Sequence, residues 1–577
     1  MSRAGSIDWC CLPRFDSDSC FGRLLDWEKG GYFAVCPTSR SQAKREYLGD
    51  SLILVTTYRS GRNSARVTDF FSMRAGGRRR PRRELVRVIE GVRGCMRLRV
   101  HIAARFDCGE VKPWVYPAGA RTHFAVGSNA GLRVYGNVPL EIRDEHDLVA
   151  EIEVRPRQRL QVALQFFRPE EAHTVARRRA ASSPRELRAH YAETLNWWRQ
   201  WSSKIVHAGG AGVNVVRSAI TLKALTYAPT GAIVAAPTTS LPEWIGGERN
   251  WDYRYCWIRD SIFTVWALND SGAQSEADGV RRFIQRSAAG NADELQVLYG
   301  VDGKRRLTEI SLDQLEGWRG SSPVRIGNAA EAQFQADMYG MIVELSWRWS
   351  LRGHRPAPAY WAFLTQIIQL AIEKWPLPDR GIWEVRSKPL HFVHSKVMCW
   401  AAVNRGIALA EKFKFQAPLQ RWREARDRMR LEIESRGIDH RRGIFVRSYG
   451  SREVDASALL LPTVDFVAHE DERMVRTADA IRRELTRDGL LLRYKHRDGL
   501  EGAEGVFLAC TFWLAECLAR QGRRQLAQRI FRRACRCANE LGLFAEQYSP
   551  QGREMLGNFP QGLTHLAHIT AALALDS

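Results

Sequence analysis

The segment of this chain best suited to chemistry covers residues 246–260, GGERNWDYRYCWIRD. It holds four aromatic residues, three arginines and two aspartates within fifteen positions. Aromatic faces stack on sugar rings, and arginine and aspartate side chains form hydrogen bonds with hydroxyl groups. The composition therefore favours a carbohydrate pocket. The alternative is a structural loop that docks helices through its aromatic residues.

Two glutamates far downstream have the surroundings expected of acid–base catalysts. Glycosidic bonds are commonly cleaved by two carboxyl groups, one acting as an acid and the other as a base or nucleophile. Glu384 follows Trp383 in a loop, and Glu546 lies between the last two predicted helices. Trp383 would exclude water and raise the pKa of Glu384. Taken alone, each glutamate is equally compatible with a capping or salt-bridged structural role.

The first part of the chain has the pattern of strands. Apolar and polar residues alternate over 96–103, 150–154 and 160–166. Alternation of this kind indicates strands with one buried face, and it predicts an antiparallel β-sandwich over residues 1–168. Residues 169–211 form a predicted linker. Within it, Ser183 as an N-cap and Pro184 in the first turn predict a helix that runs to about Trp201.

The second part, residues 212–577, has a helical pattern. Some segments are apolar on nearly every side and others have one polar face, as in a double ring whose inner helices are covered on both sides. Long loops rich in tryptophan, glycine, arginine and aspartate connect them, and such loops commonly carry the functional site. Eleven helices are predicted, near 213–228, 259–270, 276–289, 329–350, 358–374, 394–413, 418–436, 471–486, 504–521, 523–541 and 562–575.

Composition limits the other possibilities. No apolar run approaches the roughly 18 residues of a membrane span, and the N-terminal residues lack a secretory signal, so we expect a cytoplasmic protein that does not bind a membrane. The net charge is +22, with 74 arginines against 12 lysines spread over the whole chain. This bias favours a GC-rich genome over a specific nucleic-acid partner. The twelve cysteines have no metal-site spacing, so we expect reduced thiols and no metal site.

Three segments, in this order, resemble the glucoamylase-like glycoside hydrolases of family 15. Residues 250–260 are similar to the first signature of the family, residues 381–396 to the segment with the catalytic acid, and residues 544–561 to the segment with the catalytic base. Residues 5–17 resemble the start of the sandwich domain in bacterial members. Those members usually have about a dozen residues before the position that corresponds to Gly5. The resemblance therefore implies that the N-terminus of this sequence is truncated or misassigned.

The resemblance implies a fold and a set of roles. The fold would be an N-terminal antiparallel β-sandwich, a linker helix and a C-terminal (α/α)6 barrel. Glu384 would be the general acid and Glu546 the general base of an inverting enzyme. The residues implied in substrate binding are Tyr253, Trp257, Arg259, Asp260, Trp383 and, by a looser match, Arg493. Asn328 and Glu504 lie in shared segments, without an implied role.

The implied reaction is the exo-acting hydrolysis of α-glucosides without a redox cofactor. The main hypothesis is a glucoamylase-type enzyme that releases glucose from the non-reducing ends of α-glucans or oligosaccharides. The alternative is a trehalase, for which phosphate and magnesium dependence is known in the family. A third hypothesis, a non-catalytic sugar-binding protein, is disfavoured because both glutamates are intact. Residues around Trp318 and 386–391 are expected to decide the specificity, and a small carbohydrate is the only expected partner.

Overall fold

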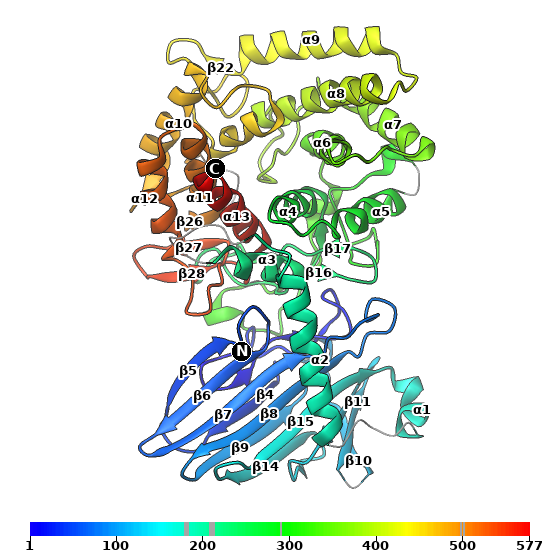
Figure 1. Cartoon of the computed structure of the whole chain (residues 1–577), viewed down its shortest axis with the longest axis vertical. Helices are drawn as coiled ribbons and strands as arrows, with labels where there is room; N and C mark the ends of the chain where they lie inside the picture. Colours follow the sequence, from blue (N-terminus) through cyan, green and yellow to red (C-terminus); the bar gives the residue numbers. More distant parts are fainter. Residues whose placement is uncertain are drawn as a thin grey trace. The chain divides into compact units, whose positions relative to one another are not determined.

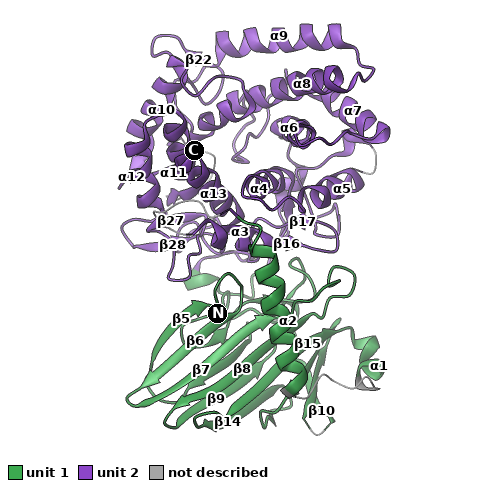
Figure 2. Ribbon diagram, viewed as in Figure 1, with its two compact units in different colours: residues 1–205, 313–320 green, residues 206–312, 321–577 purple. Residues whose placement is uncertain are grey.

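The computed structural model describes residues 1–119, 121–177, 184–206, 214–288, 291–496, 499, 502 and 504–577. The chain divides into two compact units, coloured separately in Figure 2. Unit 1 comprises Met1–Ile205 and Asp313–Gly320, and unit 2 comprises Val206–Leu312 and Ser321–Ser577. The segment around Trp318 therefore belongs to unit 1, although its neighbours in sequence belong to unit 2.

Unit 1 contains two large antiparallel sheets, as Figure 1 shows. The five-stranded sheet has the order β1 (Ser6–Ile7), β4 (Tyr32–Pro37), β9 (Met96–Ala103), β14 (Asp147–Val154), β13 (Glu141–Arg143). The eight-stranded sheet has the order β10 (Trp114–Gly119), β11 (Thr122–Gly127), β12 (Ala130–Gly136), β15 (Arg159–Phe167), β8 (Glu84–Arg93), β7 (Asn63–Phe71), β6 (Leu54–Ser60), β5 (Gln42–Tyr47). A small hairpin pairs β2 (Cys10–Cys11) with β3 (Ser19–Phe21).

The predicted sandwich is confirmed, because alternate residues of both sheets meet in one core. Val100 and Ile102 of β9 pack there with Val134 of β12 and Leu164 of β15. The opposite face of the eight-stranded sheet is covered by α2 (Pro184–Ser202), which follows the short helix α1 (Ala172–Arg177). The helix predicted to run to about Trp201 is thus present, while its predicted N-cap, Ser183, lies outside the described residues.

Unit 2 is a double ring of helices. The inner elements pack against one another in a closed cycle: α4 (Ile258–Asp270), α6 (Asp337–Leu351), α8 (Val393–Phe413), η6 (Ala456–Val464), α11 (Leu508–Arg520), α13 (Gly562–Asp576). The outer elements cover them: α3 (Val215–Ala224), α5 (Ala277–Ser287), α7 (Pro358–Lys374), α9 (Leu419–Arg436), α10 (Glu472–Leu485), α12 (Arg524–Cys535). This arrangement is the predicted (α/α)6 barrel.

Burial follows the two rings. Residues 258–268 of α4 and nearly all of α8 are buried, whereas α9 buries only Trp422, Ala425, Met429 and Ile433, at helical spacing on one face. The sequence did not reveal the fourth inner element, η6, a nine-residue 3-10 helix that contains Pro462. The predicted helix over 329–350 is divided into η5 (Ala329–Ala332) and α6, and the one over 504–521 begins only at Leu508.

Short strands and turns occupy the connections between the helices of unit 2. The strand pairs are β16 (Thr226–Tyr227) with β17 (Ala232–Ile233), β18 (Cys256–Trp257) with β19 (Leu298–Tyr299), β20 (Ile310–Ser311) with β21 (Arg325–Ile326), β22 (Ile438–Asp439) with β23 (Ile444–Phe445), and β24 (Thr486–Arg487) with β25 (Leu490–Leu491). A three-stranded sheet joins β26 (Val506–Phe507), β27 (Gln547–Ser549) and β28 (Glu554–Leu556). Within the described ranges, no helix combines the length and apolar character needed to cross a membrane.

Candidate active site

The segments that precede the inner elements of the barrel supply one cluster of polar and aromatic side chains. Their hydrogen bonds link positions hundreds of residues apart in sequence, such as Tyr253 and Glu546. The contributors are Tyr253 and Trp257 before α4, Gln335 before α6, Glu384 before α8, Asp455 before η6, Arg493 and Glu504 before α11, and Glu546 before α13.

The acid side of the cluster is centred on Glu384. The indole Nε1–H of Trp257 donates to Glu384 Oε1 at 2.8 Å, and Arg259 Nη1 lies 3.6 Å from the same oxygen. Arg259 is held in place because its Nη1 donates to the Ile382 carbonyl at 2.9 Å and its Nε donates to Asp260 Oδ1 at 3.0 Å. Four residues predicted for the site are therefore in one connected group.

The environment of Glu384 favours its protonated form. Burial raises the pKa of this carboxyl, and the nearby Asp260 raises it further, while Arg259 and hydrogen bonds from Gln335 and Trp257 act in the opposite direction. The direction agrees with a general acid, which must hold a proton at the working pH. Exclusion of water, the expected cause, is the largest contribution in the structure, whereas the hydrogen bond from Trp257 lowers this pKa.

The base side of the cluster is centred on Glu546, which is 4% exposed. The Tyr253 hydroxyl donates to Glu546 Oε1 at 2.9 Å. Oε2 has no hydrogen-bond partner among the described residues, so it is free to accept a proton from a small molecule beside it. Gly557, with φ of +79°, provides the space, because a Cβ at this position would lie 3.2 Å from Oε2.

The pKa of Glu546 is also raised, well above its ordinary value. Burial is the main cause and the negative charge of Glu243 the next, while Arg493 and the Tyr253 hydrogen bond act in the opposite direction. An acid and a base that act together at one pH need pKa values that lie apart. Both are instead raised, because both lie in the same enclosed cluster, where the ionised form loses its contact with water.

The two sides are joined by aromatic residues. The Tyr253 and Trp257 rings are in edge contact, with centroids 5.6 Å apart, so the residues that hold Glu546 and Glu384 also touch each other. Trp383, which was expected to shield Glu384, contacts Asp455 and Phe507. Its Nε1–H donates to Asp455 Oδ1 at 2.8 Å, and its ring packs against Phe507 with centroids 5.3 Å apart.

Arg493 lies behind the base in a group of ion pairs. Its Nη2 and Nε donate to the two oxygens of Glu504 at 2.6 and 2.9 Å. Arg249 Nη1 donates to Glu504 Oε1 at 2.7 Å, and Arg493 Nη2 lies 3.6 Å from Glu243 Oε2. Glu504, which had no role assigned from sequence, is therefore the carboxylate that holds both arginines.

Sequence reasoning did not select Glu243, Gln335 or Asp455 for the site. The signal for Glu243 was present, since it lies in a loop beside Trp244 and meets the criterion that selected Glu384. Gln335 was assigned to a predicted helix that the structure interrupts at that point. Asp455 is the N-cap of η6, and its side chain accepts from the Ser457 N–H, so missing that element also meant missing its cap.

Residues near the 386–391 segment form a stack beside the site. Arg386 lies 4.3 Å from the Trp251 ring centroid and Arg325 lies 4.9 Å from it. Glu309 bridges the two arginines, 3.0 Å from Arg386 Nη2 and 3.5 Å from Arg325 Nε. The stack fixes the chain two residues beyond Glu384.

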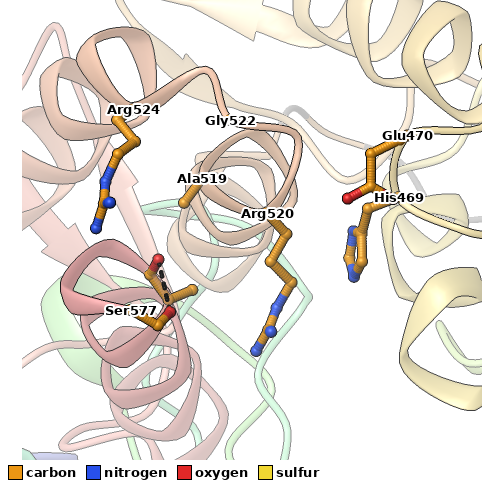
Figure 3. A pocket seen from close by; sticks show the side chains of 8 residues that line it. His469, Glu470, Ala519, Arg520, Gly522, Arg524 and Ser577 are labelled. Atoms are coloured by element: carbon orange, nitrogen blue, oxygen red, sulfur yellow. Dashed lines mark hydrogen bonds between the residues drawn. The ribbon is translucent and has the colours of Figure 1, made fainter.

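A separate cavity of about 410 Å³ lies at the end of α11 and the start of α12, and Figure 3 shows its lining side chains. The lining residues are His469, Glu470, Ala519, Arg520, Gly522, Arg524, Ala574 and Ser577, none of which belongs to the cluster above. Within the described part of the chain, no group of three or more His, Cys, Asp or Glu side chains has the arrangement to hold a metal ion.

Comparison with known proteins identifies both parts of the chain. The profile of the family described as Glycosyl hydrolases family 15 matches residues 210–573, and a profile described as Trehalase-like, N-terminal, matches residues 1–190. The chain is 38% identical to a protein named Trehalase from Mycolicibacterium smegmatis, over 99% of this chain and 88% of the relative. It is 35% identical to a protein of the same name from Thermoplasma volcanium, over 99% and 90%.

A solved structure has the same fold. The crystal structure of a bacterial glucoamylase complexed with acarbose aligns with a TM-score of 0.71, over 100% of this chain and 90% of that one. The two sequences are 15% identical in this alignment. The likeness therefore establishes the common architecture of sandwich and barrel.

Proposed function

The chain belongs to Glycosyl hydrolases family 15 and is a glycosidase, and on this premise we propose that it is a trehalase, which hydrolyses trehalose to two molecules of glucose. The observation that carries the proposal is the similarity to proteins named Trehalase over 99% of the chain, at 35–38% identity. This similarity favours the alternative from the sequence over the glucoamylase-type activity that was our main expectation. The glucoamylase structure supports the fold alone, because its identity is 15%.

In the proposed mechanism, Glu384 and Glu546 act on opposite faces of one glucose ring. Glu384 donates its proton to the glycosidic oxygen as the bond from this oxygen to the anomeric carbon breaks. Water attacks that carbon from the other face and gives its proton to Glu546 Oε2, the oxygen that has no hydrogen-bond partner among the described residues. Room for the water requires the carboxyls of an inverting enzyme to lie about 6.5–9.5 Å apart. The products are β-glucose from the attacked ring and α-glucose from the leaving ring.

The surrounding residues have defined tasks in this mechanism. Tyr253 holds Glu546 Oε1, so that Oε2 faces the water. Trp257 orients Glu384, and Arg259 and Asp260, fixed on each other at 3.0 Å, offer a donor and an acceptor to the hydroxyls of the bound glucose. Arg493 and Trp383 close the cluster behind the base, and Arg493 partly compensates the charge of Glu546.

Time-resolved proton NMR of the purified protein with trehalose, maltotriose and isomaltotriose in parallel tests the proposal. We expect turnover of trehalose alone, with equal early amounts of α- and β-glucose. Early β-glucose from either trisaccharide would instead establish a glucoamylase-type enzyme. No glucose from any of the three substrates, with the protein folded, would favour the non-catalytic hypothesis.

Two variants test the assigned roles. Glu384→Gln should reduce kcat for trehalose by several orders of magnitude, and less for α-glucosyl fluoride, whose leaving group needs no proton. Glu546→Gln should be comparably damaging with both substrates, because water must be deprotonated in each case. Unchanged activity in either variant would remove that residue from the mechanism.

A further inference from the structure

A third carboxyl group, that of Glu243, is buried near the base: the carbonyl of the preceding residue, Pro242, accepts from the Gly557 N–H at 2.8 Å, and Gly557 borders Glu546 Oε2. Glu243 lies in the loop before residues 246–260 and is 2% exposed. Its Oε1 accepts a hydrogen bond from Trp251 Nε1 at 2.9 Å. Its Oε2 has no hydrogen-bond partner among the described residues, and the nearest cationic group, Arg493 Nη2, is 3.6 Å away. A buried carboxylate with this little compensation lowers the stability of the fold. Its presence is therefore explained more readily by a functional role than by a structural one.

The guanidinium groups near Glu243 form their close ion pairs with a different carboxylate, that of Glu504. Arg493 makes both of its close contacts, at 2.6 and 2.9 Å, with Glu504, and Arg249 donates to the same carboxylate at 2.7 Å. Among the described residues of this region, the three carboxyl groups of Glu243, Glu504 and Glu546 thus face the two guanidinium groups of Arg249 and Arg493. Glu504 has the strongest compensation, so the excess negative charge falls on Glu243 and Glu546.

The other groups around Glu243 do not neutralise it. Trp251 is an uncharged donor to Glu243, Gln547 is uncharged, and the Tyr253 hydroxyl donates to Glu546. The charge of Glu243 acts on Glu546, and it is the largest contribution after burial to the raised pKa of that carboxyl. Burial and the charge of Glu504 raise the pKa of Glu243 itself, and Arg493 and Arg249 oppose them.

We propose that Glu243 is a positioning residue that acts through Glu546: its buried negative charge makes Glu546 a stronger base toward the attacking water. The inference rests on the proposed role of Glu546. A carboxylate with a higher proton affinity accepts the proton of water more readily, while it requires a higher pH to be ionised in the free enzyme. Glu243 thus lowers activity at low pH, where Glu546 is protonated, and speeds proton transfer at higher pH, where Glu546 is ionised.

The test is the pH dependence of kcat/KM in Glu243→Gln. Glutamine retains the shape and the acceptor for Trp251 Nε1 but removes the charge. The pKa of Glu546 should fall, so the acid limb of the profile should move to lower pH by about one unit, and the plateau should fall severalfold because the base is weaker. An acid limb that stays in place or moves to higher pH would refute the inference.

Two further variants separate charge from structure. Glu243→Asp retains the charge, so its acid limb should remain near that of the wild type even if the plateau is lower. If the aspartate and glutamine variants behave alike, the residue is merely structural. Glu276→Gln is the matched control, because Glu276 is 5% exposed and paired with Lys223 at 2.7 Å in the outer ring. Its acid limb should not move.

The outcome is distinguishable from failure of the proposed function. The profile can be measured on any α-glucoside that the enzyme hydrolyses, so it does not depend on trehalose being the substrate. An active Glu546→Gln variant would refute the role of the base and with it this inference. An inactive Glu546→Gln variant together with an unshifted Glu243→Gln profile would refute the inference alone.

Discussion

Replacement of Tyr253 by phenylalanine removes one oxygen atom from the centre of the site. The Tyr253 hydroxyl donates to Glu546 Oε1 at 2.9 Å, within a base that is 4% exposed. The aromatic ring and its edge contact with Trp257 would remain. The expected effect is therefore confined to loss of the hydrogen bond, which stabilises the ionised form of Glu546.

The magnitude follows from the charge of the acceptor. A hydrogen bond to a charged group contributes about 1.5–3 kcal/mol, and about 1.4 kcal/mol corresponds to a factor of ten, so the proton affinity of Glu546 should rise roughly 10- to 150-fold. The hydrogen bond lowers the pKa of Glu546, and its loss raises that pKa further. Because activity requires the ionised base, the acid limb of kcat/KM should move to higher pH by about one to two units. This shift is opposite in sign to the one expected for Glu243→Gln.

The assay is glucose release over the full pH range, with a matched control. Tyr360→Phe also deletes a buried phenol oxygen, one that lies 2.9 Å from Ser346 Oγ between α6 and α7. It should lower stability by about 0.5–1.5 kcal/mol without moving either limb. A Tyr253→Phe enzyme with kcat/KM within about twofold of the wild type and an unchanged acid limb would refute the reasoning, because a bond of this energy could not then act on the base.

Three further predictions concern the acid, the space beside the base and the scaffold. Trp257→Phe removes the donor to Glu384 Oε1; the pKa of the acid should rise, and the basic limb of the pH profile should move to higher pH. Gly557→Ala places a Cβ 3.2 Å from Glu546 Oε2 and should reduce kcat at least about tenfold. Because the backbone at this position has a φ of +79°, the same change should lower the free energy of unfolding, measured by urea titration, by about 1–2 kcal/mol. Glu344→Gln leaves Arg405 and Arg348 without their shared carboxylate in α6, and should cost about 3 kcal/mol of stability with both pH limbs unmoved.

The fold was largely predictable because its elements have regular periods. The helices expected at 358–374 and 418–436 correspond to α7 and α9 within one residue, since each has an apolar face at helical spacing. The fourth inner element, η6, was not predictable in the same way. Over Ala456–Val464 the residues are almost all apolar and Pro462 interrupts the run, so no periodicity distinguishes a 3-10 helix from a buried strand.

The candidate site was predictable in its parts but not in its electrostatics. The aromatic and charged residues of 250–260 indicated one part of the site, loop position selected Glu384 and Glu546, and the resemblance implied the roles of these two carboxyls. Their assigned roles stay predictions until the variants are measured. The pKa shifts depend on charges that converge from distant segments, such as Glu243 on Glu546, 303 positions apart by residue number. Sequence gives the type of each residue, whereas the net charge of a buried cluster is a property of the folded chain.

The backbone at Glu384 carries information that no sequence pattern contains. Glu384 has φ of +57°, in the left-handed region that costs a residue with a Cβ about 1–2 kcal/mol. Three residues earlier, Gly381 takes a φ of +65° where a Cβ would lie 2.8 Å from the Phe392 ring, so glycine is required there. Glycine would relieve the strain at position 384 as well, yet the chain has glutamate, with its carboxyl directed at Trp257 and Arg259. The strain is retained at a position whose carboxyl contacts Trp257 and Arg259. It supports a functional role for that side chain over a capping role, because a cap could be supplied without a left-handed backbone.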